Sequence, residues 1–282
     1  NEVGDTVQDE SYPVNTQEAA DNSAELEFTL EPEPAPEVTK IAELTPAIFK
    51  AYDIRGIVGQ TLHAENVTVI GQAIGSTAIE KGLNRIVVGR DGRLSSEQLS
   101  QALITGLMAS GCEVIDIGLV PTPLVSFACE HLATQAGVMV TASHNPPDYN
   151  GLKITLGGQP LFGSALQQLY QRILQGNLLS GDGQVQQLDI VDDYIARISN
   201  DIHLIRPLKV IVDCGNGVAG LVIPKLLTAL GCEVSELYCE VDGTFPNHQP
   251  NPSEPANLQD LIVTVKQNGA DLGLAFDGDG DR

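Results

Sequence analysis

The chain has 282 residues, of which 42% are apolar, and this is enough to bury the cores of two domains. A formal net charge of −22 argues against nucleic acid and anionic membranes as partners, and no apolar run approaches the length of a membrane span. The five cysteines form no Cys-x-x-Cys pair, so we expect reduced thiols and a cytoplasmic protein.

The first 40 residues carry eleven acidic side chains and one lysine, and the run at 31–37 is rich in proline. Such a segment buries too little apolar surface to offset the entropy that it would lose on ordering. We therefore predict that residues 1–43 form a disordered acidic linker. The chain starts without a methionine, so we expect further protein upstream of Asn1.

Strands and helices alternate after the linker, which is typical of α/β domains. Short apolar runs predict the strands, and runs with apolar residues three or four apart predict the helices. In the first part of the chain the predicted elements are strands at 85–89, 113–118, 136–141 and 151–156, and helices at 95–110 and 121–131. In the second part they are strands at 208–212, 232–237 and 270–276, and helices at 189–198, at 258–266 and between the 213–217 turn and Leu230.

Glycines indicate where the two parts separate. Gly181 and Gly183 predict a boundary, with one α/β domain at 44–188 and a second of similar plan at 189–282. A second glycine pair, in the turn at 213–217, could bind phosphate at a helix N-terminus or form a simple tight turn. We favour the tight turn, because the chain has no full Gly-x-Gly-x-x-Gly there.

Three aspartates alternate with glycines at the end of the chain: Asp277, Asp279 and Asp281, followed by Arg282. Carboxylate oxygens on a tight turn suit Mg²⁺ or a similar hard cation. They follow the strand at 270–276, which we expect to be buried, at the end where open α/β sheets bind ligands. A calcium-binding EF-hand loop begins in the same way but needs glycine at its sixth position, which Arg282 occupies.

The segment TASHNP at 141–146 has the same layout, since it follows a strand that is predicted to be buried. Ser143 therefore lies on a loop at a strand end, although local turn chemistry would also explain this segment. A hydrolase triad is a poor fit, because no Gly-x-Ser-x-Gly surrounds Ser143 and nothing assigns a partner to His144. Together, the serine and the aspartates supply a nucleophile and a metal cage that could act on one phosphate.

Four segments stand out along the chain: IFKAYDIRG at 48–56, VGRDGRLSS at 88–96, TASHNPPDYNGLKI at 141–154 and DGDGDR at 277–282. In their order and spacing they resemble the motifs of the α-D-phosphohexomutases, and most closely those of the bacterial phosphomannomutase/phosphoglucomutase branch. The resemblance covers about residues 44 to 282. It implies two consecutive three-layer α/β domains with mixed sheets, out of the four domains of these enzymes.

The resemblance also implies roles for individual residues. Ser143 is the serine that carries the phosphoryl group, and with the three aspartates it holds Mg²⁺. Arg282 neutralises phosphate charge, while Tyr52 and Arg55 line the active site. Lys153 matches a proposed general acid/base, whose pKa we expect to be lowered by desolvation and nearby cations.

Three further residues keep open alternatives. His144 either touches substrate or caps its loop, and Lys153 could instead be a solvated strand lysine. For Arg90 and Arg93 we favour ion pairs with Asp91 or the following helix over contact with phosphate.

For a complete protein, the resemblance implies interconversion of hexose 1-phosphates and 6-phosphates of mannose or glucose, with glucose 1,6-bisphosphate as activator. Because the match ends after the metal loop, we expect the C-terminal domains to be missing and the chain alone to be inactive or nearly so. The alternatives are a phosphoglucosamine mutase, a non-catalytic sugar-phosphate-binding regulator of the same fold, and a Mg²⁺-dependent phosphatase.

Overall fold

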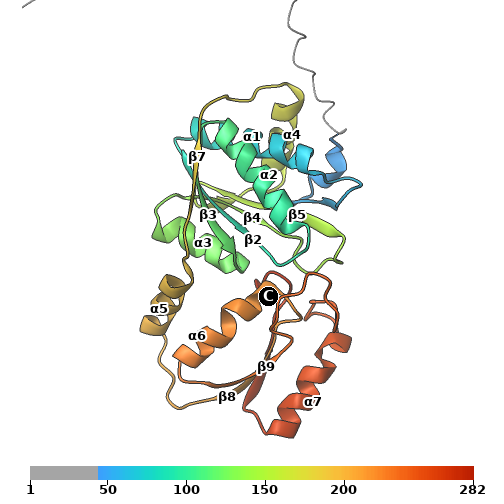
Figure 1. Cartoon of the computed structure of the whole chain (residues 1–282), viewed down its shortest axis with the longest axis vertical. Coiled ribbons are helices and arrows are strands. Elements are labelled where there is room, and N and C mark those ends of the chain that lie inside the picture. The colour runs from blue at the N-terminus through green and yellow to red at the C-terminus, as the bar shows by residue number, and fades with distance from the viewer. Residues whose placement is uncertain (1–43) are drawn as a thin grey trace, which may run out of the picture. The chain divides into compact units, whose positions relative to one another are not determined.

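The computed structural model describes residues 44–282, and the predicted disordered linker lies outside this described part. Two layered α/β lobes confirm the predicted fold class (Figure 1). We call them the large lobe, which holds β1 to β7 and α1 to α4, and the small lobe, which holds β8 to β10, α6 and α7.

The large lobe is built on a sheet with the strand order β1-β5-β4-β2-β3-β7, with β6 paired to β5. Its strands are β1 (Ile54–Ile57), β2 (Arg85–Arg90), β3 (Glu113–Leu119), β4 (Ala136–Val140), β5 (Tyr149–Leu156), β6 (Gln159–Pro160) and β7 (Gln184–Gln187). Strand β5 runs antiparallel to β1 and β4, whereas β4, β2, β3 and β7 are parallel, so the sheet is mixed. The helices are η1 (Pro46–Ile48), α1 (Ala64–Glu80), α2 (Ser96–Ala109), α3 (Thr122–His131) and α4 (Ser164–Leu174).

Alternating side chains of the central strands bury two apolar faces of this sheet. In β2, Ile86 and Val88 pack with α1, α2 and α4, while Val87 packs on the opposite side with α3. Figure 1 shows the same arrangement, with α1, α2 and α4 on one side of the sheet and α3 on the other. Leu99, Leu103 and Leu107 of α2 are buried in the first of these cores.

The small lobe has three parallel strands in the order β10-β8-β9, so mixed pairing is confined to the large lobe. Its elements are β8 (Lys209–Asp213), η2 (Val218–Leu221), α6 (Ile223–Ala229), β9 (Glu233–Leu237), η3 (Pro255–Leu258), α7 (Gln259–Asn268) and β10 (Leu272–Ala275). Ile223 and Leu227 cover one face of the sheet. On the other face α7 approaches so closely that a Cβ on Gly273 would lie 2.8 Å from Val265 Cγ2.

Helix α5 (Val191–Asp201) connects the lobes, because Ile190, Val191 and Ile195 share a core with α3 and with Val222 of the small lobe. The large lobe and the small lobe therefore pack against each other through the apolar side chains of this shared core.

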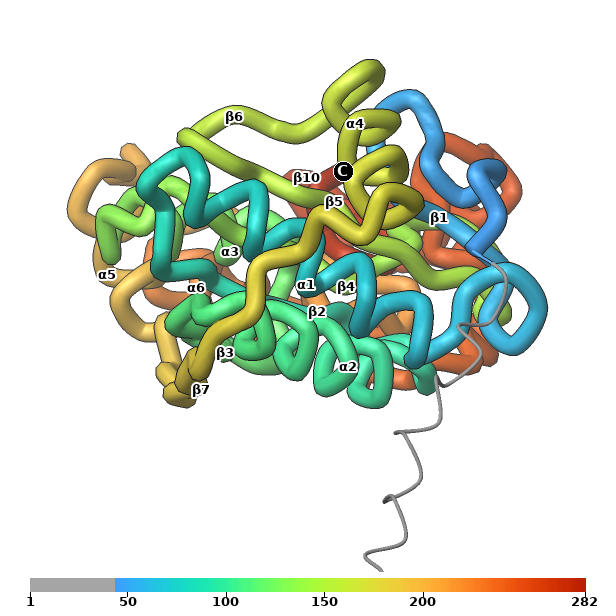
Figure 2. The backbone as a smooth tube through the Cα atoms, turned by 90° about the horizontal axis from the view of Figure 1, so that it is seen from above, coloured from blue at the N-terminus to red at the C-terminus, as the bar shows by residue number. Residues whose placement is uncertain are grey.

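Strand β7 follows Gly181 and Gly183 and pairs with β3 along its outer side, and it lies within the predicted domain at 44–188 (Figure 2). The two glycines let the chain pass the α2–β3 turn, where a Cβ on Gly183 would lie 2.1 Å from the carbonyl oxygen of Cys112. The expectation of a buried strand at 270–276 is wrong, because β10 is half-buried.

Candidate active site

The candidate site lies where the carboxyl ends of β4 and β10 meet. The serine loop (residues 141–146) follows β4 in the large lobe, and the acidic loop (residues 277–282) follows β10 in the small lobe. The hydroxyl of Ser143 donates a hydrogen bond of 2.6 Å to Asp277 Oδ2, although the two residues are 134 positions apart in the sequence. The two motifs that the sequence singled out therefore form one site.

Ser143 itself is held in an uncommon backbone conformation. Its φ of 53° lies in the left-handed region, which a non-glycine residue adopts only when its surroundings hold it there. The Thr141 hydroxyl accepts a hydrogen bond of 2.8 Å from the Ser143 amide. The side chain of Ser143 is thereby aimed at the small lobe while the residue stays 2% exposed.

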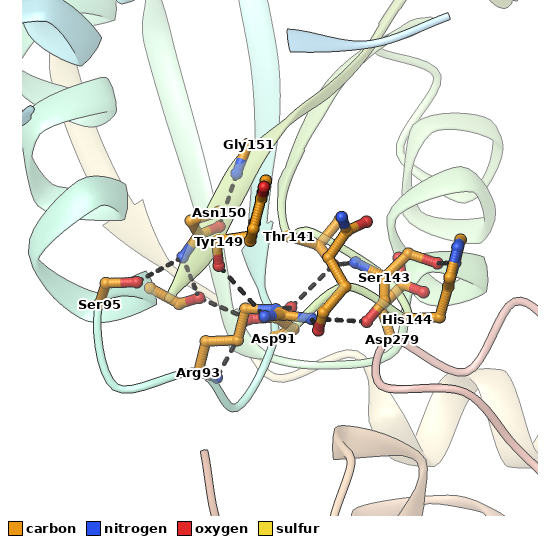
Figure 3. Close-up of polar contacts among 12 residues, drawn as sticks. Asp91, Arg93, Ser95, Thr141, Ser143, His144, Tyr149, Asn150, Gly151 and Asp279 are labelled. Carbon is orange, nitrogen blue, oxygen red and sulfur yellow. Dashed lines mark hydrogen bonds and ion pairs between the residues drawn. The ribbon is translucent and has the colours of Figure 1, made fainter. Parts of the chain in front are cut away.

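Arg93 is the main support of the serine loop (Figure 3). Its guanidinium donates to the carbonyl oxygens of Ser143 and Asn145, both at 2.7 Å, and to those of Pro146 and Tyr149 at 2.6 and 3.1 Å. One buried side chain thus satisfies four backbone acceptors. It fixes the path of the loop on both sides of Ser143.

Asp91 holds Arg93 in place through an ion pair in which both side chains are almost completely buried. The Asp91 carboxylate also accepts from the Ser96 hydroxyl, and from the Thr141 hydroxyl at 2.7 Å. Burial raises the pKa of Asp91 despite the neighbouring guanidinium, and burial lowers the pKa of Arg93 despite the carboxylate. The expected pairing of Arg93 with Asp91 is confirmed, whereas Arg90 has no ion pair among residues 44–282.

The acidic loop is a turn organised by its first aspartate. Asp277 Oδ1 accepts the amides of Asp281 and Arg282 at 3.1 and 3.2 Å, and its carbonyl oxygen accepts the Gly280 amide at 3.0 Å. Gly280 has a φ of 70°, which glycine adopts without strain. The turn therefore closes on itself and directs its carboxylates toward Ser143 and β5.

The aspartates of this loop are close enough to repel one another. One carboxylate oxygen from each of Asp277, Asp279 and Asp281 lies within 4.8 Å of the others. Burial, and then the charges of Asp279 and Asp281, raise the pKa of Asp277 to about 6. The folded protein therefore carries an ionised Asp277 at neutral pH against an electrostatic cost.

Lys153 of β5 offsets part of this negative charge. Its Nζ lies 2.7 Å from Asp279 Oδ2 and 2.6 Å from Asp281 Oδ2, while the apolar neighbours Leu152 and Ile154 are buried. Burial acts to lower the pKa of Lys153, but the two carboxylates outweigh it and raise that pKa. The expectation of a lowered lysine pKa is wrong here because the nearest charges are anions, not cations.

The residues present fit a divalent cation. Asp279 Oδ2 is shared by Lys153 and the Thr122 hydroxyl, whereas Asp279 Oδ1 is buried and has no hydrogen-bond partner. A buried carboxylate oxygen without a partner is costly, and three hard oxygen ligands are what Mg²⁺ prefers. Asp277, Asp279 and Asp281 are therefore the candidate ligands, with Ser143 beside them.

A cavity of about 640 Å³ opens beside Ser143. Its wall includes the predicted site residues Tyr52, Arg55, Lys153 and Arg282, together with Thr122 and Ser126. Tyr52 is 79% exposed, and Arg55 donates to Asn145 Oδ1 at 2.5 Å and pairs with Asp53. The structure therefore brings these side chains to the site that their motifs predicted.

Two predicted residues flank Ser143 more loosely. His144 Nδ1 lies 3.3 Å from Ser143 Oγ, and burial together with Arg282 and Arg55 lowers the pKa of His144. Arg282 is about half exposed, with Nε 4.0 Å from Asp277 Oδ2. Contact of His144 with substrate stays a prediction.

Sequence reasoning missed the supporting side chains. Thr122, at the start of α3, donates to Asp279 at 2.6 Å, and Asn145 contacts Arg55. The only sequence features that could have indicated a role in the site were the position of Thr122 near a strand end and the position of Asn145 within the serine motif. The role of Arg93 as a support for four carbonyl groups left no signal in the sequence beyond its neighbour Asp91.

Comparison with known proteins agrees with this geometry. A family model described as "Phosphoglucomutase/phosphomannomutase, alpha/beta/alpha domain I" matches residues 46–179, and the corresponding domain II model matches residues 192–282. The chain belongs to the phosphoglucomutase/phosphomannomutase family. The expected membership in the phosphohexomutases is thereby confirmed.

Named relatives of this family are highly similar. A phosphomannomutase/phosphoglucomutase of Pseudomonas aeruginosa is 55% identical over 86% of this chain and 52% of its own length. A phosphoglucomutase of Neisseria meningitidis serogroup B is 49% identical over 86% of this chain and 53% of its own length. The crystal structure of a Burkholderia thailandensis phosphoglucomutase/phosphomannomutase family protein gives a TM-score of 0.82 at 48% identity, covering 85% of this chain and 54% of that one.

The chain thus spans about half the length of the relatives that it matches. Within the part that the structure describes, no helix has the length and apolarity that a membrane crossing requires.

Proposed function

We propose that this chain forms the phosphoryl-carrying part of a phosphomannomutase/phosphoglucomutase, with Ser143 as the carrier. The observation that supports this most strongly is the contact between Ser143 Oγ and Asp277 Oδ2, which brings the serine loop and the acidic loop together at the mouth of a cavity. A serine beside three carboxylates suits phosphoryl transfer, in which positioning and charge neutralisation supply most of the catalysis.

The proposed substrates are the 1-phosphates and 6-phosphates of mannose or glucose. A phosphoryl group on Ser143 passes to the free hydroxyl of the bound sugar, which gives a 1,6-bisphosphate. As the hydroxyl oxygen bonds to phosphorus, the bond from phosphorus to Ser143 Oγ breaks. The hydroxyl proton passes to Lys153 in its neutral amine form, and the Ser143 oxygen takes up a proton as it leaves. The reverse steps at the other phosphate regenerate phosphoserine and leave the isomerised sugar phosphate.

The acidic loop is proposed to hold Mg²⁺ through Asp277, Asp279 and Asp281, next to Ser143. The bound ion supplies positive charge against the phosphoryl oxygens, which carry nearly two negative charges on a phosphoserine. Arg282 and Arg55 face the same cavity and add to this charge. Tyr52, on the exposed rim, is proposed to contact the sugar.

Lys153 is proposed to move the proton. Asp279 and Asp281 are the groups that raise its pKa, so the ammonium keeps its proton at neutral pH while it is paired with them. The same two carboxylates are proposed metal ligands. If they bound a cation in place of the Lys153 ammonium, the cause of the raised Lys153 pKa would be removed. The proton affinity of Lys153 is thereby tied to the state of the acidic loop.

The compartment is proposed to be the cytoplasm. All five cysteines are free thiols, as expected for a reducing environment, and the proposed substrates are phosphorylated sugars.

The carrier role of Ser143 is tested on the full-length protein, which is incubated with Mg²⁺ and glucose 1,6-bisphosphate, the proposed activator, before its phosphopeptides are mapped. Phosphate on Ser143, absent from a Ser143→Ala variant that keeps its fold, is the expected result. An unmodified Ser143 in a folded protein that binds Mg²⁺ contradicts the proposal and favours a regulator. Release of inorganic phosphate without isomerised sugar identifies a phosphatase, and turnover of glucosamine phosphates in place of mannose or glucose phosphates identifies a phosphoglucosamine mutase.

A further inference from the structure

Two cysteines of the small lobe lie in contact without being bonded. Cys214 follows β8 directly, and Cys239 lies two residues beyond the end of β9, the parallel neighbour of β8. Their Sγ atoms are 3.4 Å apart, and both are free thiols. A disulfide needs an S–S distance of about 2.05 Å, so a shift of little more than 1 Å would allow these two side chains to bond.

The two cysteines differ in burial. Cys214 is fully buried in the apolar core of the small lobe. Cys239 is half-buried and lines a cavity of about 330 Å³ together with polar and charged residues, among them Asn216, Glu236 and Asn247. Cys239 is therefore the residue of the pair that lies nearer to a small polar oxidant in this cavity.

The contact also makes the two thiols chemically unequal. The hydrogen bond between the two thiols lowers the pKa of Cys239, against the opposing effects of burial and the carboxylates of Glu236 and Asp213. The same contact and burial raise the pKa of Cys214. Cys239 is thus the thiol that ionises first, with its proton-bearing neighbour positioned behind it.

We propose that Cys214 and Cys239 are a redox modification site, at which a hydroperoxide converts the dithiol to a reversible disulfide. The Cys239 thiolate attacks the peroxide oxygen, the O–O bond breaks, and Cys239 becomes a sulfenic acid as water or an alcohol leaves. Cys214 then attacks the sulfur of that sulfenic acid and releases water. Two thiols are oxidised by two electrons and one peroxide is reduced, so the step balances.

The disulfide would act on the candidate active site through the turn at 214–217. The Cys214 carbonyl oxygen accepts the Gly217 amide at 2.7 Å, and the Val218 amide donates to the Gly278 carbonyl oxygen of the acidic loop at 3.2 Å. Gly217 is so close to the acidic loop that a Cβ there would lie 2.9 Å from the Gly278 oxygen. Pulling Cys214 toward Cys239 therefore shifts the turn against which the acidic loop rests.

The test treats the folded chain with hydrogen peroxide, blocks remaining thiols with an alkylating reagent, and maps peptides without reduction. We expect a cross-link between Cys214 and Cys239, a fall from five free thiols to three, and full reversal by dithiothreitol. Cys232→Ser, a matched change at another half-buried cysteine of the small lobe, should leave the cross-link intact. Cys239→Ser should abolish it and leave Cys214 unmodified.

Hydrogen exchange supplies a second readout that does not depend on enzymatic activity or on a metal. In the oxidised chain we expect amide exchange at 214–218 and at 277–280 to rise several-fold, with no change in α1. Oxidation of Cys239 to sulfinic acid without a cross-link to Cys214 would overturn the proposed site. A cross-link that leaves exchange in both segments unchanged would overturn its effect on the acidic loop.

Discussion

The serine loop and the acidic loop meet at one site, but they are stabilised in opposite ways. In the serine loop a buried arginine satisfies four carbonyl oxygens, and Asp91 balances its charge. In the acidic loop the backbone is satisfied as well, but three carboxylates face one another with Lys153 as their closest cation. The first loop is complete by itself, whereas the second has excess negative charge that a divalent cation would neutralise.

This difference predicts that charge removal has opposite effects in the two loops. Substitution in the network of the serine loop should destabilise the fold, because each member leaves a buried polar partner behind. Substitution in the acidic loop should stabilise the metal-free fold at the expense of metal binding. Such a conflict between stability and function is common at catalytic sites.

The largest effect is expected for Arg93→Met. It leaves Asp91 buried without its cation and removes the guanidinium donors of four carbonyl groups, of which Pro146 keeps the Tyr149 amide, so the free energy of unfolding should fall by about 3 to 5 kcal/mol. Urea denaturation measures the loss. The matched control is Arg197→Met, whose pair with Asp201 is solvent-exposed and should contribute less than about 0.5 kcal/mol. Similar small losses in both variants would contradict the supporting role of Arg93.

Asp277→Asn should raise the stability of the metal-free chain at pH 7 by about 1 to 3 kcal/mol, since the raised pKa shows that the ionised side chain is unfavourable there. The amide keeps a similar shape and can donate to Ser143 Oγ. Unfolding in the presence of EDTA measures the gain, and calorimetry should show that Mg²⁺ binding is lost. Asp281→Asn serves as the control at a more exposed carboxylate, and a loss of stability in Asp277→Asn would refute the argument.

The same pKa predicts a pH dependence. The pKa of Asp277 is raised from 3.8 in the unfolded chain to about 6, so the folded state binds more protons between these values. Metal-free stability should therefore decrease as pH rises from about 4 to 6, and Mg²⁺ affinity should fall up to about tenfold for each pH unit below 6, because the cation must displace a proton. Titration of both quantities across this window checks the prediction, and the metal-free stability of Asp277→Asn, which lacks this titrating group, is the reference for the first of them.

The smallest effect is expected for Lys153→Met. Because the ammonium competes with a divalent cation for Asp279 and Asp281, its removal should raise Mg²⁺ affinity about twofold to fivefold, equivalent to an ion pair of up to about 1 kcal/mol. Calorimetric titration measures the change. Lys209→Met, which breaks the exposed pair with Glu233 at 3.9 Å, should leave the affinity unaltered. Weaker Mg²⁺ binding in Lys153→Met would show that the lysine assists the metal instead of competing with it.

Most elements of both lobes could be predicted from the sequence, because apolar periodicity and proline or glycine positions are local signals. The predicted strand at 136–141 is β4, and the predicted helix at 95–110 is α2. The predicted elements left out β1, α1, α4 and β7 of the large lobe. Gly181 and Gly183 also serve close packing against the α2–β3 turn, which their local turn signal did not indicate.

For the candidate site, too, some features could be predicted from local sequence signals and others could not. Ser143 and the three aspartates could be named from their motifs, and their placement at strand ends followed from the strands before them. The motifs did not indicate that Arg93 supports the serine loop, that Lys153 pairs with Asp279 and Asp281, or that Cys214 touches Cys239. Each of these contacts joins side chains from different elements.

The sequence alone therefore determined the order and type of most elements, the family resemblance and the chemical groups at the two loops. Only the tertiary structure decided that Ser143 Oγ lies 2.6 Å from Asp277 Oδ2, that burial and the neighbouring carboxylates raise the pKa of Asp277, and that Asp279 and Asp281 raise the pKa of Lys153. The physical reason is the difference in the range over which local and tertiary interactions act. Propensity and periodicity act over a few residues, whereas desolvation and charge interactions depend on which surfaces the packed lobes bring together.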